Sequence, residues 1–234
     1  MMLDEATMRR WFKATGAGRA AMLLLLLAPA ASWAQYVPPP GHDHDAAPQP
    51  SLMERPAKPR TLPAGAIALQ PLIDATPAGG ELQLEAKVYA APATITRPIT
   101  LKGAPGTVLD GGGVGSLLLV KADGVTISGI TFRNTGDRHD ALDAGIQLRG
   151  RFNIVKDSVF ENCLFGLDLQ QAHSNILRRN RITSQAVDQG IRGDAIRLWY
   201  SNDVRVEDNE VTDSRDSVIW YSTGVKFLRN SFAN

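Results

Sequence analysis

Carboxylate side chains gather with arginine and histidine in two short stretches of the chain. The first stretch contains Asp137, Arg138, His139, Asp140 and Asp143, and the second contains Asp188, Arg192 and Asp194. Such groups can act as general acid and base on a polysaccharide, or can bind a cation. A lyase, hydrolase or epimerase would use Asp140, Asp143, Asp168 or Asp194 together with Arg197. Alternatively, both stretches are solvated loops that Asp–Arg pairs hold in place.

A second group of residues suits binding rather than catalysis. The chain repeats a Trp-Tyr-Ser triplet at residues 199–201 and 220–222, which are 21 residues apart. An exposed aromatic ladder of this kind is either a repeat consensus or a platform for sugars or for another protein. The residues that we expect to bind a partner are Trp199, Trp220, Arg192, Arg215 and Asp216.

A metal could be held near the N-terminus. His42-Asp43-His44-Asp45 offers His42 and His44 to a soft divalent ion such as Cu(II) or Zn(II). The motif leaves both copper and zinc open as the metal of this chain. Cys163 is the single cysteine, so no disulfide can form within the chain, and we expect its thiol to be a small buried apolar group.

A repeat of about 21 residues must position these side chains. Two apolar columns recur at matching intervals, namely Ile127, Val155, Leu177, Val206 and Phe227, and Phe132, Phe160, Ile182, Val211 and Phe232. A leucine-rich repeat would place a helix or loop where this chain has a second alternating strand at residues 195–200. The pattern therefore favours an all-β, single-stranded parallel β-helix, and parallel crossovers are right-handed.

The repeat also assigns side chains to the two faces of its first strand. We expect Leu119, Leu148, Leu169, Leu198 and Ile219 to point inward. We expect Leu118, Gln147, Asp168, Arg197 and Val218 to point outward, beside Arg149, Gln170, Trp199 and Trp220. Both charged stretches are insertions at the same place in alternate repeats, so they should share one corner. A polar column of Ser158, Asn180, Asn209 and Asn230 suits a sharp turn, because Asn tolerates left-handed backbone and can hydrogen-bond to its neighbours in the stack.

The chain divides into three parts. Residues 1–34 combine basic residues with five consecutive leucines and read as a signal peptide cleaved before Gln35, too short for a stable membrane span. Residues 35–65 are expected to form a proline-rich, disordered linker, and residues 66–234 form the β-helix with a short N-terminal capping helix. The last repeat has no capping element, so either the sequence is truncated or a partner covers that edge. The net charge of +1 excludes the basic field that nucleic acid requires.

Four segments resemble the NosD-like family of β-helix proteins. They are Pro98-Ile-Thr-Leu-Lys-Gly-Ala-Pro-Gly-Thr-Val-Leu-Asp-Gly-Gly-Gly113, Asp143-Ala-Gly-Ile146, Gly193-Asp-Ala-Ile-Arg-Leu-Trp199 and Ser214-Arg-Asp216. This resemblance covers residues 66–234, and this chain is shorter than most members. It implies a periplasmic, non-enzymatic accessory protein for nitrous oxide reductase maturation, which delivers copper together with an ABC transporter and a copper chaperone. The matching segments contain Asp143, Asp194, Arg197, Arg215 and Asp216. The alternative is a carbohydrate-active β-helix.

Overall fold

The computed structural model describes residues 58–233 of the 234-residue chain. The predicted signal peptide and the candidate metal ligands His42 and His44 lie outside the described residues. Most of the predicted linker, residues 35–65, also lies outside them.

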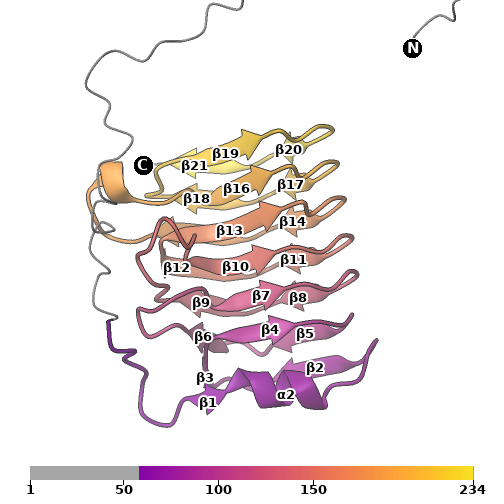
Figure 1. The fold of residues 1–234 in the computed structure, drawn as a ribbon, viewed down its shortest axis with the longest axis vertical. Coiled ribbons are helices and arrows are strands. Elements are labelled where there is room, and N and C mark those ends of the chain that lie inside the picture. Colours follow the sequence, from indigo (N-terminus) through magenta and orange to yellow (C-terminus); the bar gives the residue numbers. More distant parts are fainter. Residues whose placement is uncertain (1–57, 234) are drawn as a thin grey trace, which may run out of the picture. The chain divides into compact units, whose positions relative to one another are not determined.

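Three parallel sheets wrap around one core (Figure 1). Sheet A contains β1 (Ile67–Ala68), β3 (Val88–Ala90), β6 (Val108–Asp110), β9 (Thr131–Arg133), β12 (Val159–Cys163), β15 (Arg181–Ser184), β18 (Glu210–Thr212) and β21 (Ser231–Ala233). Sheet B contains β2 (Glu81–Leu84), β5 (Thr100–Gly103), β8 (Thr126–Ser128), β11 (Ile154–Lys156), β14 (Ile176–Arg178), β17 (Arg205–Glu207) and β20 (Lys226–Leu228). Sheet C contains β4 (Ala93–Ile95), β7 (Leu118–Val120), β10 (Ala144–Leu148), β13 (Phe165–Gln170), β16 (Ile196–Trp199) and β19 (Ser217–Trp220).

Each turn of the chain passes through sheets C, B and A in that order. Paired strands belong to successive turns and are parallel, so that the turns stack about 4.8 Å apart. This arrangement is the predicted single-stranded right-handed parallel β-helix.

The two predicted apolar columns fill the interior. In sheet B, Ile127, Val155, Leu177 and Val206 follow one another in register and are at most 1% exposed. In sheet A, the column runs from Phe132 through Phe160, Ile182 and Val211 to Phe232. Both columns are confirmed. Stacked side chains of this kind supply most of the stabilisation, because apolar burial contributes about 25 cal/mol per Å².

The prediction for sheet C is wrong by one residue in its first turn. Leu148 pairs with Val120 rather than with Leu119, and Leu118 is fully buried while Leu119 lies on the outer face. The outward column therefore begins at Leu119 and continues through Gln147, Asp168, Arg197 and Val218. Residues 117–120 are all apolar, so alternation provides no contrast that would fix the register there.

The polar column joins sheets B and A as a ladder inside the fold. The backbone N–H groups of Ser158, Asn180 and Asn209 each donate to the side chain of the asparagine one turn later, at 3.2, 2.9 and 2.9 Å. The left-handed residues are instead their predecessors, namely Asp157, Arg179, Asp208 and Arg229, with φ between 51 and 57°. The prediction of left-handed asparagines is wrong because the amide must point inward to bond the stack.

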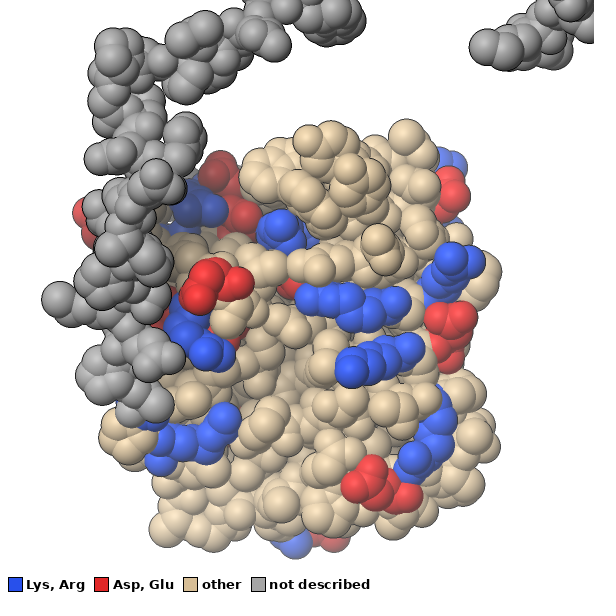
Figure 2. Space-filling model, viewed as in Figure 1, with Lys and Arg blue, Asp and Glu red and all other residues tan. Residues whose placement is uncertain are grey.

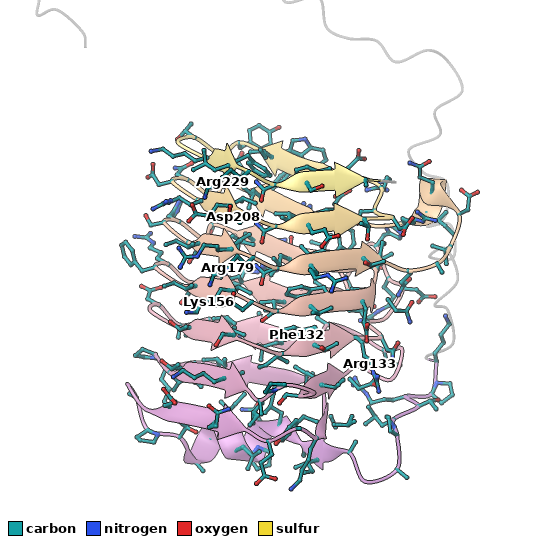
Figure 3. The ribbon with its side chains drawn as sticks, turned by 180° about the vertical axis from the view of Figure 1, so that it is seen from behind. Phe132, Arg133, Lys156, Arg179, Asp208 and Arg229 are labelled. Carbon is teal, nitrogen blue, oxygen red and sulfur yellow. The ribbon has the colours of Figure 1, made fainter. Side chains whose placement is uncertain are left out.

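A second ladder of opposite charges follows these left-handed residues along the outside. Arg179 donates to both carboxylate oxygens of Asp157 at 2.6 and 2.9 Å, and Arg229 binds Asp208 with the same two distances. Figure 3 shows Arg179, Asp208 and Arg229 above one another on successive turns. The hydrogen bonds from arginine lower the pKa of Asp157 and of Asp208.

The substitution Arg179→Gln is expected to raise the pKa of Asp157 toward its ordinary value, because it removes the hydrogen bonds that favour the carboxylate. A folded-state pKa below the unfolded one means that this pair stabilises the fold above the unfolded pKa. That contribution is lost as the pH falls through the folded pKa. NMR titration of the carboxyl carbons measures the shift. Arg229→Gln is the matched control, and it should leave the pKa of Asp157 in place. An unchanged Asp157 titration in Arg179→Gln would contradict this prediction.

The N-terminal end carries the predicted capping helix. Helix α2 (Leu69–Ala75) buries Leu69 and Ile73 against the first turn. The Gln70 side chain accepts a hydrogen bond from the N–H of Thr94 at 2.6 Å and donates one to the Thr94 carbonyl at 3.2 Å. These two bonds satisfy backbone groups of the edge strand β4. Pro71 is tolerated because the first helical turn has N–H groups without intrahelical partners.

An extended segment at residues 58–65 precedes the helix. The Arg60 guanidinium donates to the carbonyl groups of Ala91, Gly111 and Val114 at 2.6, 3.0 and 3.0 Å. These bonds fix residues 58–65, the last part of the predicted disordered linker, to the first turns. No helix within residues 58–233 has the length and apolar character that crossing a membrane requires.

Candidate functional site

The outer face of sheet C carries the polar and aromatic side chains that the repeat predicted there. Gln147, Asp168 and Arg197 form one column, and Arg149, Gln170, Trp199 and Trp220 form the next. Sheet C faces the viewer in Figure 1, and Figure 2 shows Lys and Arg side chains across the middle of this face, below an uncharged patch.

Asp168 is the centre of a buried ion-paired triad. Its carboxylate is fully buried and accepts Arg149 Nη2 at 2.7 Å and Arg197 Nη1 at 2.8 Å. Gln170 Nε2 adds a longer bond of 3.3 Å. The side chain of Arg197 is 12% exposed and that of Arg149 is 25% exposed. Two charge-assisted hydrogen bonds hold this carboxylate, and neighbouring side chains shield it from water.

Four aromatic residues cover one end of this triad, and we name them the aromatic cluster: Trp199, Tyr200, Trp220 and Tyr221. The two indole rings lie in adjacent turns with centroids 5.3 Å apart, and the two phenol rings stack at 4.8 Å with an interplanar angle of 11°. The Arg197 guanidinium lies 5.1 Å from the Trp199 ring and 5.9 Å from the Trp220 ring. These cation–π contacts connect the triad to the cluster.

The aromatic cluster remains open to the outside. Tyr200, Trp220 and Tyr221 are 47%, 51% and 66% exposed. Large aromatic side chains that pack against the protein on one side and are exposed on the other are typical anchors of protein interfaces.

A groove lies beside the aromatic cluster, where sheet C turns toward sheet B. Its volume is about 750 Å³, and its lining includes Arg149, Arg151, His173, Tyr200, Asn202 and Tyr221. The groove therefore combines arginine, amide, imidazole and phenol groups on one surface.

The two charged insertions meet at one corner, as the repeat predicted. His139 in the first insertion places Nε2 2.9 Å from the carbonyl oxygen of Ile191 in the second. Gln185, which precedes the second insertion, donates to the carbonyl of Gly136 at 3.1 Å. Asp188 caps the single-turn 3-10 helix η1 (Gln189–Ile191) through the N–H of Gly190 at 2.9 Å.

Two of the candidate catalytic carboxylates at this corner are buried and held by arginine. Arg138 binds Asp143 with side-chain distances of 3.2 and 3.3 Å, and its backbone N–H donates to the same carboxylate at 3.1 Å. This hydrogen bonding raises the pKa of Arg138. Arg215 binds Asp194 at 2.8 Å. The arrangement is that of loops fixed by Asp–Arg pairs.

The remaining predicted site residues lie at or near this corner. Asp140 is exposed in the first insertion. Arg192 donates to the carbonyl groups of Val187 and Asp213, at 2.8 and 3.0 Å, so it fixes the second insertion to the next turn. Asp216 is 60% exposed and lies 3.5 Å from Arg215.

The geometry limits the acid–base chemistry that this surface can perform. Of the four candidate carboxylates, Asp143, Asp168 and Asp194 are buried and paired, whereas Asp140 is exposed. A general acid or base must reach the proton that it transfers. The paired carboxylates are arranged to orient arginine side chains rather than to exchange protons with a substrate.

The described residues offer little to a soft metal. Within residues 58–233, no three His, Cys, Asp or Glu side chains form a group that could hold an ion. Cys163 is buried, and burial raises the pKa of its thiol, which disfavours the thiolate that binds metals.

Sequence reasoning did not identify Arg149, Tyr200 and Tyr221 as functional residues. The signal for the tyrosines is their place in the Trp-Tyr-Ser triplets. In the structure both tyrosines have left-handed backbone, with φ of 48 and 50°, at the corner after sheet C. The repeat places Arg149 on the outer face beside the Asp168 column, but spacing alone does not predict the ion pair between the two side chains.

Comparison with known proteins gives matches to the fold and to one curated relative. Residues 115–234 match the family described as right handed beta helix region. Over 140 residues, 58% of this chain, the sequence is 33% identical to a protein of Pseudomonas aeruginosa named "Probable ABC transporter binding protein NosD". The chain spans about a third of the length of that relative.

Two solved structures of pectin methylesterase in complex with hexasaccharides also align with the fold. One is 16% identical with a TM-score of 0.48 and covers 62% of this chain and 51% of its own. The other is 15% identical with a TM-score of 0.47 and covers 68% of this chain and 60% of its own.

Proposed function

This chain belongs to the right-handed β-helix family and is NosD-like in sequence, and from that premise we propose that it is an exported, non-catalytic protein that binds partners along sheet C. Its partner is an ABC transporter, and the process that it serves is copper delivery during maturation of nitrous oxide reductase. A copper chaperone is the second proposed partner. The predicted signal peptide, residues 1–34, supports a periplasmic location.

The single observation that carries this proposal is the buried triad beneath the aromatic cluster. Asp168 is fully buried between Arg149 and Arg197, and the Arg197 guanidinium lies 5.1 and 5.9 Å from the centroids of the two indole rings. Rigid aromatic side chains with a fixed cation behind them lose little conformational entropy on binding. The surface is thus preorganised to dock a protein.

Copper enters this proposal as cargo. The described residues present no donor set for it, so we infer that it passes between the transporter, the chaperone and the reductase. His42 and His44 are the only copper ligands that the sequence predicts in this chain.

Affinity capture tests the proposed function. The exported protein is tagged, host membranes are extracted in mild detergent, and co-purified proteins are identified by mass spectrometry. We expect an ABC transporter to be enriched relative to a tag-only control. Enrichment of no transporter, together with efficient cleavage of an acidic polysaccharide by the purified protein, would overturn the proposal in favour of a carbohydrate-active enzyme.

A further inference from the structure

We infer that the groove beside the aromatic cluster binds an acidic, extended peptide segment of a protein partner. This inference deepens the proposed function and rests on it, because it names the chemistry of the partner at the same face.

Several hydrogen-bond acceptors around the groove are already engaged within the fold. His173 Nδ1 accepts the backbone N–H of Asn202 at 3.1 Å, and the Asn202 side-chain oxygen accepts the N–H of Thr223 at 2.9 Å. Asp123 Oδ1 likewise accepts the N–H of Arg151 at 2.7 Å. The bond to Nδ1 assigns the ring proton of His173 to Nε2. The exposed Arg151 guanidinium and the His173 Nε2–H group are donors that can meet a ligand.

The charges on this surface also favour an anion. Arg149 and Arg151 line the groove together with Asp123. Arg149 shares the buried Asp168 with Arg197, so that two guanidinium groups face one carboxylate in the triad. The groove and the triad together carry three guanidinium groups and two carboxylates, which leaves a net positive charge. Carboxylate groups meet such donors in short, charge-assisted hydrogen bonds.

The orientation of the aromatic rings favours a peptide over a sugar. Tyr200 and Tyr221 cover each other face to face, and Trp199 packs against Tyr221 with an interplanar angle of 81°. Face-to-face stacking leaves fewer ring faces free for a sugar, and the edge is the electropositive part of an aromatic ring. Ring edges and arginines attract carboxylates, and Tyr, Trp and Arg are the residues enriched in protein interfaces.

Titration with short peptides tests this inference on the full exported chain. The probe is a capped hexaglutamate, tryptophan fluorescence is the readout, and hexaglutamine and hexagalacturonate are the comparison ligands. We expect hexaglutamate to bind most tightly of the three, and its affinity to fall as salt is raised. Equal binding of hexaglutamate and hexaglutamine, or tighter binding of hexagalacturonate, would overturn the inference.

The substitution Arg151→Gln locates the binding to the groove. Arg151 is exposed, and its backbone bond to Asp123 survives the substitution, so the fold should be retained. We expect hexaglutamate affinity to fall about tenfold, since one charge-assisted contact is lost. Arg181→Gln, at a 72% exposed arginine in sheet A, is the matched control and should bind as the wild type does. Equal losses in both variants would overturn the assignment to this groove.

Failure of peptide binding and failure of transporter binding have different consequences. Transporter capture without hexaglutamate binding would overturn the inference and leave the proposed function standing. Hexaglutamate binding that Arg151→Gln abolishes, without any transporter capture, would support the anion preference of the groove and overturn the proposed partner.

Discussion

Asp168→Asn is expected to lower the free energy of unfolding by about 3–5 kcal/mol, toward the lower end because Arg149 is 25% exposed. The substitution preserves the shape of the side chain but removes the charge between two arginines, and an amide NH₂ cannot accept their hydrogen bonds. Urea denaturation followed by circular dichroism measures the loss. The aromatic cluster should loosen as well, because Arg197 loses its anchor beneath both indole rings.

Asp216→Asn is the matched control for this prediction. Asp216 is 60% exposed and pairs with Arg215 at the longer distance of 3.5 Å, so its loss should change stability by about 0–1 kcal/mol. The comparison also distinguishes a structural carboxylate from a catalytic one. Removal of a structural carboxylate lowers the free energy of unfolding, whereas catalytic groups are commonly held at a cost in stability. An Asp168→Asn variant as stable as the wild type would contradict the structural role assigned to Asp168.

Phe160→Ala is expected to destabilise the fold by about 3–5 kcal/mol. The Phe160 ring is fully buried and stacks on Phe132 with centroids 4.9 Å apart and an interplanar angle of 8°. Gly145 packs against the same ring so closely that a Cβ there would lie 2.5 Å from it. Because the surrounding backbone is already closely packed, we expect it to fill little of the cavity that the alanine leaves. The shift in the urea midpoint measures the effect.

Phe232→Ala provides the control within the same column. Phe232 occupies the equivalent position in β21 but is 51% exposed, so the same truncation removes far less buried surface. We expect a loss of about 1 kcal/mol or less, in line with substitutions outside the core. Similar losses at both positions would contradict the view that burial in the stacked column stabilises the domain.

Much of the fold follows from the sequence because a solenoid repeats its constraints. The columns through Phe132 and Ile127 recur at matched intervals, and each recurrence independently fixes which residues face inward. The insertions could be placed at one corner for the same reason, since both enter at the same point of the repeat. The prediction of strand register fails where polar and apolar residues do not alternate, as in the apolar run at residues 117–120.

The candidate site was harder to predict than the fold. The outward position of Asp168 and the pairing of Trp199 with Trp220 in adjacent turns follow from alternation and period. The burial of Asp168 does not, because it depends on how Arg149 and Arg197 lie over the sheet from the turns on either side. Arginine side chains have several rotatable bonds, and sequence spacing leaves their final direction undetermined. The sequence therefore left acid–base chemistry and pairing with arginine both open for the candidate acids, and three of the four are paired in the structure.

The most direct test of the central claim is the affinity of the purified ABC transporter for the immobilised exported protein. Surface plasmon resonance would compare the wild type with Trp220→Ala, using Phe152→Ala as the control because Phe152 is a 64% exposed aromatic residue outside the cluster. We expect saturable binding that Trp220→Ala weakens by tenfold or more, as removal of an interface anchor costs about 2 kcal/mol. Undiminished binding by Trp220→Ala, or a loss equal to that of Phe152→Ala, would contradict the claim that sheet C docks the transporter.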